Sequence, residues 1–214
     1  MDKNYWNNYY RVHANNKNIV EQSSFAKFCL NNFFSKKNLN IVELGSGNGR
    51  DALFFAHHKH SVVAIDQSLS GIETKMQKLD NKIKSLLKPK VSNFIQEDYT
   101  KYDNIDVFYS RFTIHSITKK DEIILLKKVY KSLINNGLFC IEVRTIKDPL
   151  YGKGASYGKN TFIFNKHKRR FIDANVFRKQ VLNLGFRELY FVEKNNLSIH
   201  KNDNPVLMRI ILTK

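Results

Sequence analysis

Cysteine is scarce in this chain: Cys29 and Cys140 are the only two among 214 residues, and each lies between apolar neighbours. We expect buried, reduced thiols and no metal, because a disulfide framework or a zinc site needs more cysteines at closer spacing. Proline occurs three times, and no Pro- or Gly-rich linker, internal repeat or low-complexity tail marks a boundary. The length therefore favours a single domain over residues 1–214 with one substantial core.

Long apolar runs are also missing. None approaches the roughly 18 to 20 residues that cross a bilayer, and the polar opening MDKNYWNNYY does not read as a secretion signal, so we expect a cytoplasmic protein without membrane insertion. Acidic residues are few, with 19 Asp and Glu against 36 Lys and Arg, which gives a formal charge of +17. This excess suits nucleic acid, an anionic membrane or an acidic small substrate, but lysines spread along the whole chain also describe an ordinary solvated surface.

Short β-branched and aromatic runs alternate with helix-length segments, which is typical of βαβ units around a parallel sheet. We expect strands over residues 39–44, 61–66, 91–98, 105–112, 137–145, 186–193 and 206–214. We expect helices over residues 50–58, 70–87, 118–136 and 173–184. The predicted fold class is α/β: a Rossmann-like, seven-stranded, mostly parallel sheet with an antiparallel terminal edge strand and helices on both faces.

A glycine-rich loop, ELGSGNGRD, follows the first expected strand, with Gly45, Gly47 and Gly49 at alternate positions behind the acidic Glu43. Such glycines let the backbone turn sharply and let a ligand approach where a Cβ would collide. Loops that seat a dinucleotide pyrophosphate space their glycines G-x-G-x-x-G, so the G-x-G-x-G spacing departs from that class. The loop predicts a site for a different ligand.

Together with an acid at the end of the second strand and another after the third, this loop resembles the class I S-adenosylmethionine-dependent methyltransferases. The first motif of that family reads hydrophobic-hydrophobic-E/D-x-G-x-G-x-G, and the resemblance runs through most of the chain. It implies a methyltransferase (EC 2.1.1.-) that uses S-adenosyl-L-methionine and releases S-adenosyl-L-homocysteine. The implied cofactor-binding residues are Tyr10, Arg11, Glu43, Gly45, Ser46, Gly47, Asn48, Gly49, Arg50, Asp51, Asp66, Gln67, Ser68, Asp98, Tyr99 and Ser110.

Three of these acids have implied roles. Asp51 meets the cofactor's α-amino group, directly or through water. Asp66 accepts hydrogen bonds from both ribose hydroxyls, because an ionised carboxylate offers acceptors and no donors. Asp98 takes the adenine amino group, with Tyr99 beside it. The alternative for each acid alone is an ordinary N-cap or turn residue.

The fourth expected strand ends in YSRFTIH, at the sheet edge where open α/β folds bind ligands. Methyltransferases of nucleobase nitrogens often carry an Asn or Asp, two prolines and an aromatic here, and those of pyrimidine carbon a cysteine. Both of these chemistries lose support, while ribose and guanine methylation stay open. His115 and Arg111 are the candidate catalytic residues. His115 suits a general base for a hydroxyl acceptor, or else caps the next helix. Arg111 suits a two-pronged clamp on a carboxylate or anionic substrate, or else a surface ion pair.

The connection over residues 145–172 is long, and it predicts a lid-like insertion. Cations and aromatic residues gather there and suit a small acceptor that is anionic, nucleotide-linked or sugar-like; a merely solvated loop is the alternative. The candidate substrate-binding residues are Tyr9, Arg144, Tyr151, Lys153, Tyr157, His167, Arg169 and Arg170.

Several short stretches, IEVRTIKDPLYGKG, KRRFID, NPVLMRIILTK and YWNNYYRVH, are similar to a narrower group of bacterial methyltransferases. That group is associated with capsule, surface-polysaccharide and phosphonate-type clusters, and some members O-methylate a capsular phosphoramidate. The resemblance implies an O-methyltransferase with an N-terminal helical cap over about residues 1–37. Two alternatives stay open: an RNA-modifying methyltransferase that uses the basic surface, and a cofactor binder without turnover. The chain shows no appended RNA domain, which makes nucleic acid the less favoured partner.

Overall fold

The computed structural model describes residues 21–34, 38–68, 70–165, 167–200 and 202–214. Its contacts divide the chain into two compact units, Asp2–Tyr109 and Ser110–Lys214, and each is described by itself. Tyr9, Tyr10 and Arg11 lie outside the described residues, as does most of the expected N-terminal cap.

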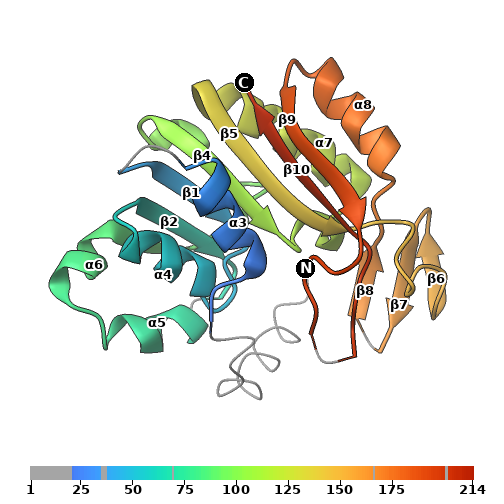
Figure 1. The fold of residues 1–214 in the computed structure, drawn as a ribbon, viewed down its shortest axis with the longest axis horizontal. Helices are drawn as coiled ribbons and strands as arrows, with labels where there is room; N and C mark the ends of the chain where they lie inside the picture. The colour runs from blue at the N-terminus through green and yellow to red at the C-terminus, as the bar shows by residue number, and fades with distance from the viewer. Residues whose placement is uncertain (1–20, 35–37, 69, 166, 201) are drawn as a thin grey trace. The chain divides into compact units, whose positions relative to one another are not determined.

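The first unit is built on parallel strands. Its strands are β1 (Asn40–Leu44), β2 (Ser61–Asp66), β3 (Leu87–Val91) and β4 (Ile105–Arg111), the last of which runs just past the unit's end. Its helices are α3 (Ser24–Asn32), α4 (Arg50–His57), α5 (Ser70–Met76), α6 (Asn81–Leu86) and the short 3-10 helix η1 (Tyr99–Lys101). β1 pairs in parallel with both β2 and β4, and β2 with β3 (Figure 1). The carboxyl ends of β1 and β2 therefore meet at one edge of the sheet.

The third strand was predicted in the wrong place. In the structure it occupies residues 87–91 rather than 91–98, and the expected helix over 70–87 is two short helices, α5 and α6. The break comes at Asp80, whose side chain accepts a hydrogen bond from the Ile83 N–H (2.9 Å) and so begins a new helix. Pro89 lies in β3, the edge strand of the sheet, where a missing N–H is tolerated.

The second unit is antiparallel. Its strands are β5 (Leu133–Arg144), β9 (Arg187–Lys194) and β10 (Leu207–Thr213), and its helices are α7 (Lys119–Ser132), α8 (Ala174–Asn183) and the 3-10 helix η2 (Ile114–Ser116). β10 pairs antiparallel with β5 and with β9, and the seven-stranded sheet has the order β3-β2-β1-β4-β5-β10-β9. The predicted fold class is confirmed, although β9 rather than the final strand forms the edge.

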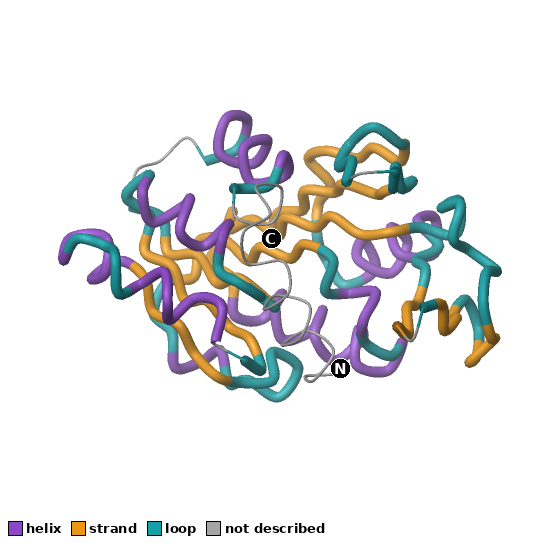
Figure 2. Tube along the Cα trace, turned by 90° about the horizontal axis from the view of Figure 1, so that it is seen from below, coloured by secondary structure: helices purple, strands orange, loops and turns teal. Residues whose placement is uncertain are grey.

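The residues 145–172, expected as a lid-like insertion, contain a separate three-stranded antiparallel sheet. Its strands are β6 (Ala155–Gly158), β7 (Thr161–Phe164) and β8 (His167–Arg170), drawn in orange in Figure 1 and as short strands joined by loops in Figure 2. Tyr151, Phe162 and Phe171 pack their rings against one another, with centroids 5.2 to 6.1 Å apart. The insertion is therefore a β-element with an aromatic cluster of its own.

Each unit also has an aromatic core. In the first, the Tyr109 ring lies 5.2 Å from Phe25 and 5.1 Å from Phe55, so α3 and α4 are joined to β4. In the second, Phe186 packs edge-on against Tyr130 at 4.9 Å. Among the helices of the described residues, none is both long and apolar enough to span a membrane.

Candidate functional site

The glycine loop has the backbone that its sequence predicts. Gly45, Gly47 and Gly49 all adopt positive φ, at 74°, 56° and 69°. The amides of Gly45 and Ser46 both donate to the carbonyl of Ile65 at the end of β2, at 2.8 and 3.0 Å. A Cβ at Gly49 would lie 2.3 Å from Ile72 Cδ1 on α5. The loop is therefore fixed between β2 and α5.

Asp66, at the end of β2, is hydrogen-bonded to this loop. Its Oδ2 accepts from the Gly47 amide at 2.8 Å, and its Oδ1 from the Ser68 amide at 3.0 Å. Burial raises the pKa of Asp66, and backbone hydrogen bonds from Gly47, Ser68 and Gln67 oppose that rise. Each carboxylate oxygen still has a second lone pair, so Asp66 can accept two further hydrogen bonds from a ligand.

Two polar side chains at the loop are buried with an unfilled acceptor. Glu43 is 4% exposed and Ser46 is 7% exposed, and neither Glu43 Oε2 nor Ser46 Oγ has a hydrogen-bond partner among the described residues. Burial raises the pKa of Glu43 well above its usual range, the nearby Asp51 raises it further and Arg50 opposes this. An unpartnered buried carboxyl is costly, and a ligand ammonium or hydroxyl would satisfy it. The residues at the loop thus fit a cofactor with an α-amino group.

Asp51 is held by hydrogen bonds within the protein. It is 3% exposed. Its Oδ1 accepts from the Ser23 amide at 2.7 Å, and its Oδ2 from the Ser23 hydroxyl at 2.7 Å and the Tyr109 hydroxyl at 2.8 Å. Ser23 is the N-cap of α3, so Asp51 anchors the start of that helix. Glu43 is therefore the acid with the unfilled acceptor.

Asp98 and Tyr99 follow the third strand. The Asp98 carboxylate accepts from the Thr100 amide at 3.2 Å as the N-cap of η1, and its side chain is 51% exposed. Tyr99 is buried, donates its hydroxyl to the carbonyl of Phe94 at 2.5 Å, and packs edge-on against Phe108 at 4.9 Å. Asp98 thus makes the turn contacts named as its alternative, and Tyr99 lies in the core.

Lys75, on α5, was not predicted. Its ammonium donates to the carbonyl of Asn48 at 3.0 Å, so it brings a positive charge to the glycine loop. Burial lowers the pKa of Lys75 to about 8, the charge of Arg50 adds to this, and Asp51 and Glu43 oppose it. Nothing in the sequence separates Lys75 from the many lysines on solvated helix faces.

In the second unit, Arg111 belongs to a buried ion-pair network. Its Nε donates to Glu142 Oε1 at 2.9 Å and its Nη2 to Ser198 Oγ at 2.7 Å. Arg209 Nε donates to the other Glu142 oxygen at 2.5 Å, and the two residues are directly opposite in the β10–β5 register. Arg111 thus makes an ion pair, but a buried one and not the surface pair named as its alternative. The sequence signal for this network was an acid and an arginine, each interrupting an apolar strand.

His115 lies on η2 and is 4% exposed. Its ring stacks on Phe112 with centroids 5.6 Å apart, and its Nδ1 has no hydrogen-bond partner among the described residues. Burial lowers the pKa of His115 well below its usual range, and the positive charges of Arg169, Arg144, His167 and Arg170 lower it further. The imidazole is therefore neutral at pH 7.

Arg170 holds the turn that carries His115. Its Nε donates to the Ile117 carbonyl at 2.9 Å, and its Nη2 donates to the Ile114 carbonyl at 3.1 Å and to Glu122 at 2.6 Å. Glu122, on α7, is fully buried. Arg170 thus connects β8 to both ends of η2, which is a positioning role that the sequence did not indicate.

The other predicted substrate residues differ in their surroundings. Arg144 is buried and pairs with Asp148 at 2.9 Å and with Asp203. Ser110, predicted at the cofactor, is buried and shares a hydrogen bond with Thr113. Tyr151 is partly exposed and donates its hydroxyl to Asn160, and Lys153 and Tyr157 are exposed. His167 is buried and Arg169 is half-buried.

A sequence profile described as a methyltransferase domain matches residues 35–175. The chain belongs to this methyltransferase family. Solved structures with the same fold include the glycopeptide N-methyltransferase MtfA in complex with S-adenosylmethionine, at TM-score 0.69 and 14% identity, covering 91% of this chain and 94% of the other. MtfA has also been solved with S-adenosylhomocysteine. The methyltransferase therefore uses S-adenosylmethionine and releases S-adenosylhomocysteine.

Two further structures share the methyltransferase's fold. One is the 1,6-didemethyltoxoflavin-N1-methyltransferase of Burkholderia thailandensis, at TM-score 0.71 and 12% identity, covering 98% of this chain and 87% of that one. The other is a SAM-dependent methyltransferase from Methanosarcina mazei, at TM-score 0.73 and 16% identity, covering 86% and 96%. No curated protein sequence gives a significant match.

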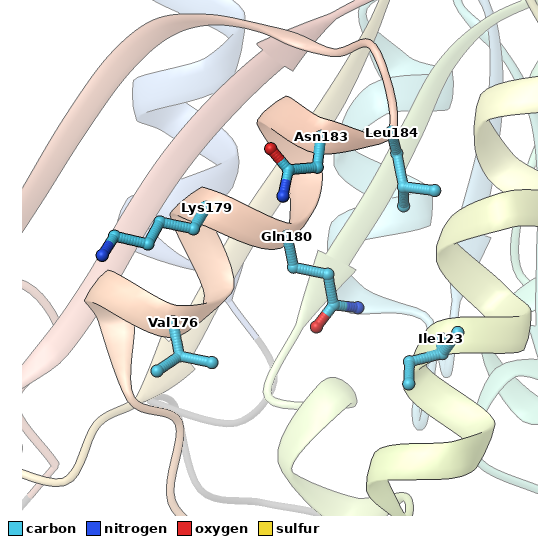
Figure 3. Close-up of a pocket in the computed structure, with 6 residues that line it drawn as sticks. All are labelled: Ile123, Val176, Lys179, Gln180, Asn183 and Leu184. Atoms are coloured by element: carbon cyan, nitrogen blue, oxygen red, sulfur yellow. The ribbon is translucent and has the colours of Figure 1, made fainter.

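The methyltransferase has an open hollow of about 430 Å³ between α7 and α8, lined by Ile123, Val176, Lys179, Gln180, Asn183 and Leu184 (Figure 3). None of the predicted site residues lines it, so the candidate site lies elsewhere. In the described part of the chain, no three His, Cys, Asp or Glu side chains are grouped in a way that could hold a metal ion.

Proposed function

We propose that this methyltransferase transfers a methyl group to an oxygen atom of a small anionic or carbohydrate acceptor. The observation that carries the proposal is the buried, neutral His115, whose Nδ1 has no partner among the described residues. A nitrogen acceptor with a free lone pair needs no such base, whereas a hydroxyl does. The N-methyltransferase names of MtfA and of the Burkholderia enzyme describe those proteins, and they support a small-molecule acceptor through the shared fold.

For the pathway, we propose assembly of a bacterial capsule or surface polysaccharide, with a sugar precursor or a phosphoramidate as the acceptor. This rests on the similarity of IEVRTIKDPLYGKG, KRRFID and NPVLMRIILTK to that group. Basic and aromatic residues of the 145–172 segment are its second support. Screening nucleotide-linked sugars and phosphoramidates for methyl transfer from labelled cofactor tests the proposal, and transfer to RNA alone would contradict it.

When bound, S-adenosylmethionine supplies a methyl group activated by its sulfonium. In our proposal, Glu43 accepts a hydrogen bond from the α-ammonium, because its Oε2 is the unfilled buried acceptor at the loop. Lys75 and Arg50 provide positive charge for the carboxylate, and Asp66 accepts from the ribose hydroxyls. His115 takes the proton from the acceptor hydroxyl. The protein otherwise has to align the reactants and exclude water.

Asp66→Ala is expected to weaken cofactor binding about 10- to 100-fold, because hydrogen bonds to a charged group contribute roughly 1.5–3 kcal/mol each. The variant also loses the acceptor that holds the Gly47 amide. Calorimetric titration with S-adenosylhomocysteine measures the effect. Asp103→Ala, which removes the same charge from an exposed position, is the matched control. Equal affinities in the two variants would remove Asp66 from the cofactor site.

A second function, RNA modification, is favoured by the formal charge of +17. It predicts RNA binding that weakens steeply as salt rises, because each neutralised phosphate releases a counterion. Filter binding of single-stranded RNA across a salt series separates the two functions. Binding that is weak at low salt would leave the small-molecule acceptor as the function.

A further inference from the structure

A basic cluster surrounds His115 within the second unit. η2, which carries His115, packs against β8 and β5. We call His115, His167 and Arg169 the His115 cluster. His115 and His167 are both buried, at 4% and 6% exposure, and Arg169 is half-buried. Among the described residues, the charge of Arg169 lowers the pKa of His115 more than any other charge does.

Two further cations that act on His115 are paired with carboxylates. Arg144 on β5 pairs with Asp148, and Arg170 on β8 pairs with Glu122 on α7. Lys168, between Arg169 and Arg170, instead lies over the Tyr157 ring at 4.6 Å. Arg144 and Arg170 thus contribute to the positive potential at His115, and their ion pairs join β5 and β8 to neighbouring residues.

Positive charge alone does not indicate a ligand site, but a buried imidazole nitrogen without a hydrogen-bond partner does. A buried polar atom without a partner costs free energy, and native proteins fill such positions with ligand, water or protein atoms. His115 Nδ1 has no partner among the described residues, and the leading charge effects on its pKa come from cations. A ligand that suits both features carries a negative charge for the cations and a hydroxyl that can donate to the neutral imidazole nitrogen.

We propose that the His115 cluster binds an oxyanion of the methyl acceptor, a phosphoryl or carboxylate group, through Arg169 and His167, with His115 Nδ1 beside it. The proposal rests on the proposed function for its acceptor, and it narrows that acceptor from anionic or carbohydrate to a molecule with an oxyanion. Arginine and histidine are suited to this because both donate hydrogen bonds to oxygen atoms with charge assistance. The proposal requires only that the charge of Arg169 acts on His115, whatever other groups Arg169 contacts.

An oxyanion in the cluster must raise the pKa of His115. The free protein disfavours the imidazolium because positive charges surround it, and a bound anion cancels part of that potential. By linkage, the protonated protein binds the anion more tightly by the same factor, about tenfold for each pKa unit. Sulfate is a suitable probe, because its charge does not change over the pH range in which histidine titrates.

The test is a histidine NMR titration of the full chain with labelled histidine, at constant ionic strength, in chloride and in saturating sulfate. The chain has seven histidines, and the spectrum of His115→Gln assigns the His115 signal. We expect sulfate to raise the pKa of His115 by about one unit or more. An identical titration in both salts would overturn the proposal.

Matched variants locate the effect. Arg169→Gln is expected to weaken sulfate binding about tenfold or more, whereas Lys168→Gln, which removes one charge from the neighbouring residue, leaves it nearly unchanged. If Arg169→Gln does not fold, His167→Gln takes its place. Equal sulfate affinity in the Arg169 and Lys168 variants would reduce the effect to general surface charge and contradict the site.

Methyl phosphate and acetate distinguish the source of the oxyanion. A His115 shift with methyl phosphate alone assigns a phosphoryl group, and a shift with acetate as well extends the site to carboxylates; both support an oxyanion site. These measurements involve neither cofactor nor turnover. A failed methyl-transfer screen with intact sulfate binding therefore counts against the proposed function alone, and the reverse result counts against the oxyanion site alone.

Discussion

Replacing Glu142 by alanine is expected to lower the free energy of unfolding by about 3–5 kcal/mol. The carboxylate is completely buried, and it receives Arg111 Nε at 2.9 Å and Arg209 Nε at 2.5 Å. The side chains of these arginines are only 14% and 7% exposed. Removal of the acid leaves two guanidinium groups next to each other with little access to water. The loss is therefore much larger than for an exposed pair.

Urea denaturation measures this loss, with an unchanged m-value showing that the transition itself is the same. Glu188→Ala is the matched control, because Glu188 also accepts two hydrogen bonds from one arginine, Arg178, but the two side chains are 20% and 35% exposed. We expect it to cost at most about 1 kcal/mol. A comparable loss of unfolding free energy in the two variants would show that burial does not increase the cost of removing Glu142.

The origin of the cost can be separated further. A triple variant with Arg111→Met, Glu142→Leu and Arg209→Met removes all three charges together. It should recover most of the stability lost in Glu142→Ala, because apolar replacement of a whole buried ionic group is often neutral. A triple variant as unstable as Glu142→Ala would instead indicate that packing, and not uncompensated charge, sets the loss.

The glycine loop and Asp66 were predictable from the sequence because their signals are local. Alternating glycines demand positive φ, and an acid at the end of a strand is placed by the strand itself. The prediction of the third strand was wrong because the local signals there were misleading. Asp80 begins a second helix within what reads as one segment, and a strand that contains Pro89 lacks the β-branched pattern.

The roles of the cations were not predictable, because the sequence does not show which carboxylate each one meets. Arg111 pairs with an acid 31 residues away and Arg170 with one 48 residues away. Only the register of β10 on β5 brings Arg209 opposite Glu142. A charge count over the 145–172 segment therefore predicts a binding surface, whereas the structure shows that Arg170 in this segment is held by Glu122.

His115→Ala is expected to lower the rate of methyl transfer to a hydroxyl acceptor about 100-fold or more, which is the contribution of a positioned general base. His115→Gln keeps a polar side chain but has no group that titrates, so its rate of methyl transfer should fall by a similar factor. Steady-state kinetics with an acceptor from the screen measures both variants. A negligible loss would indicate an acceptor oxygen that is already anionic and needs no base.

The pH dependence follows from the direction of the pKa shift. A base must be unprotonated, and burial and the neighbouring cations hold the pKa of His115 below 6.5 in the free protein. The kcat/KM of the wild type, which reports the free enzyme, should therefore stay level as pH falls to 6.5 and decrease only below it. An oxyanion on the bound acceptor raises this pKa, so the acid limb of kcat should lie at higher pH than that of kcat/KM. Coincident limbs would contradict an oxyanion bound beside His115.

Arg170 separates the chemistry of His115 from its placement. Arg170→Ala removes three hydrogen bonds that fix η2 and Glu122, and it should lower kcat without the loss of the acid limb. Arg170→Lys keeps the charge that His115 experiences but cannot reach both carbonyls with one planar group. If the lysine variant restores the pH profile and only part of kcat, Arg170 acts by positioning the turn. Full restoration of kcat by lysine would show that its charge alone matters.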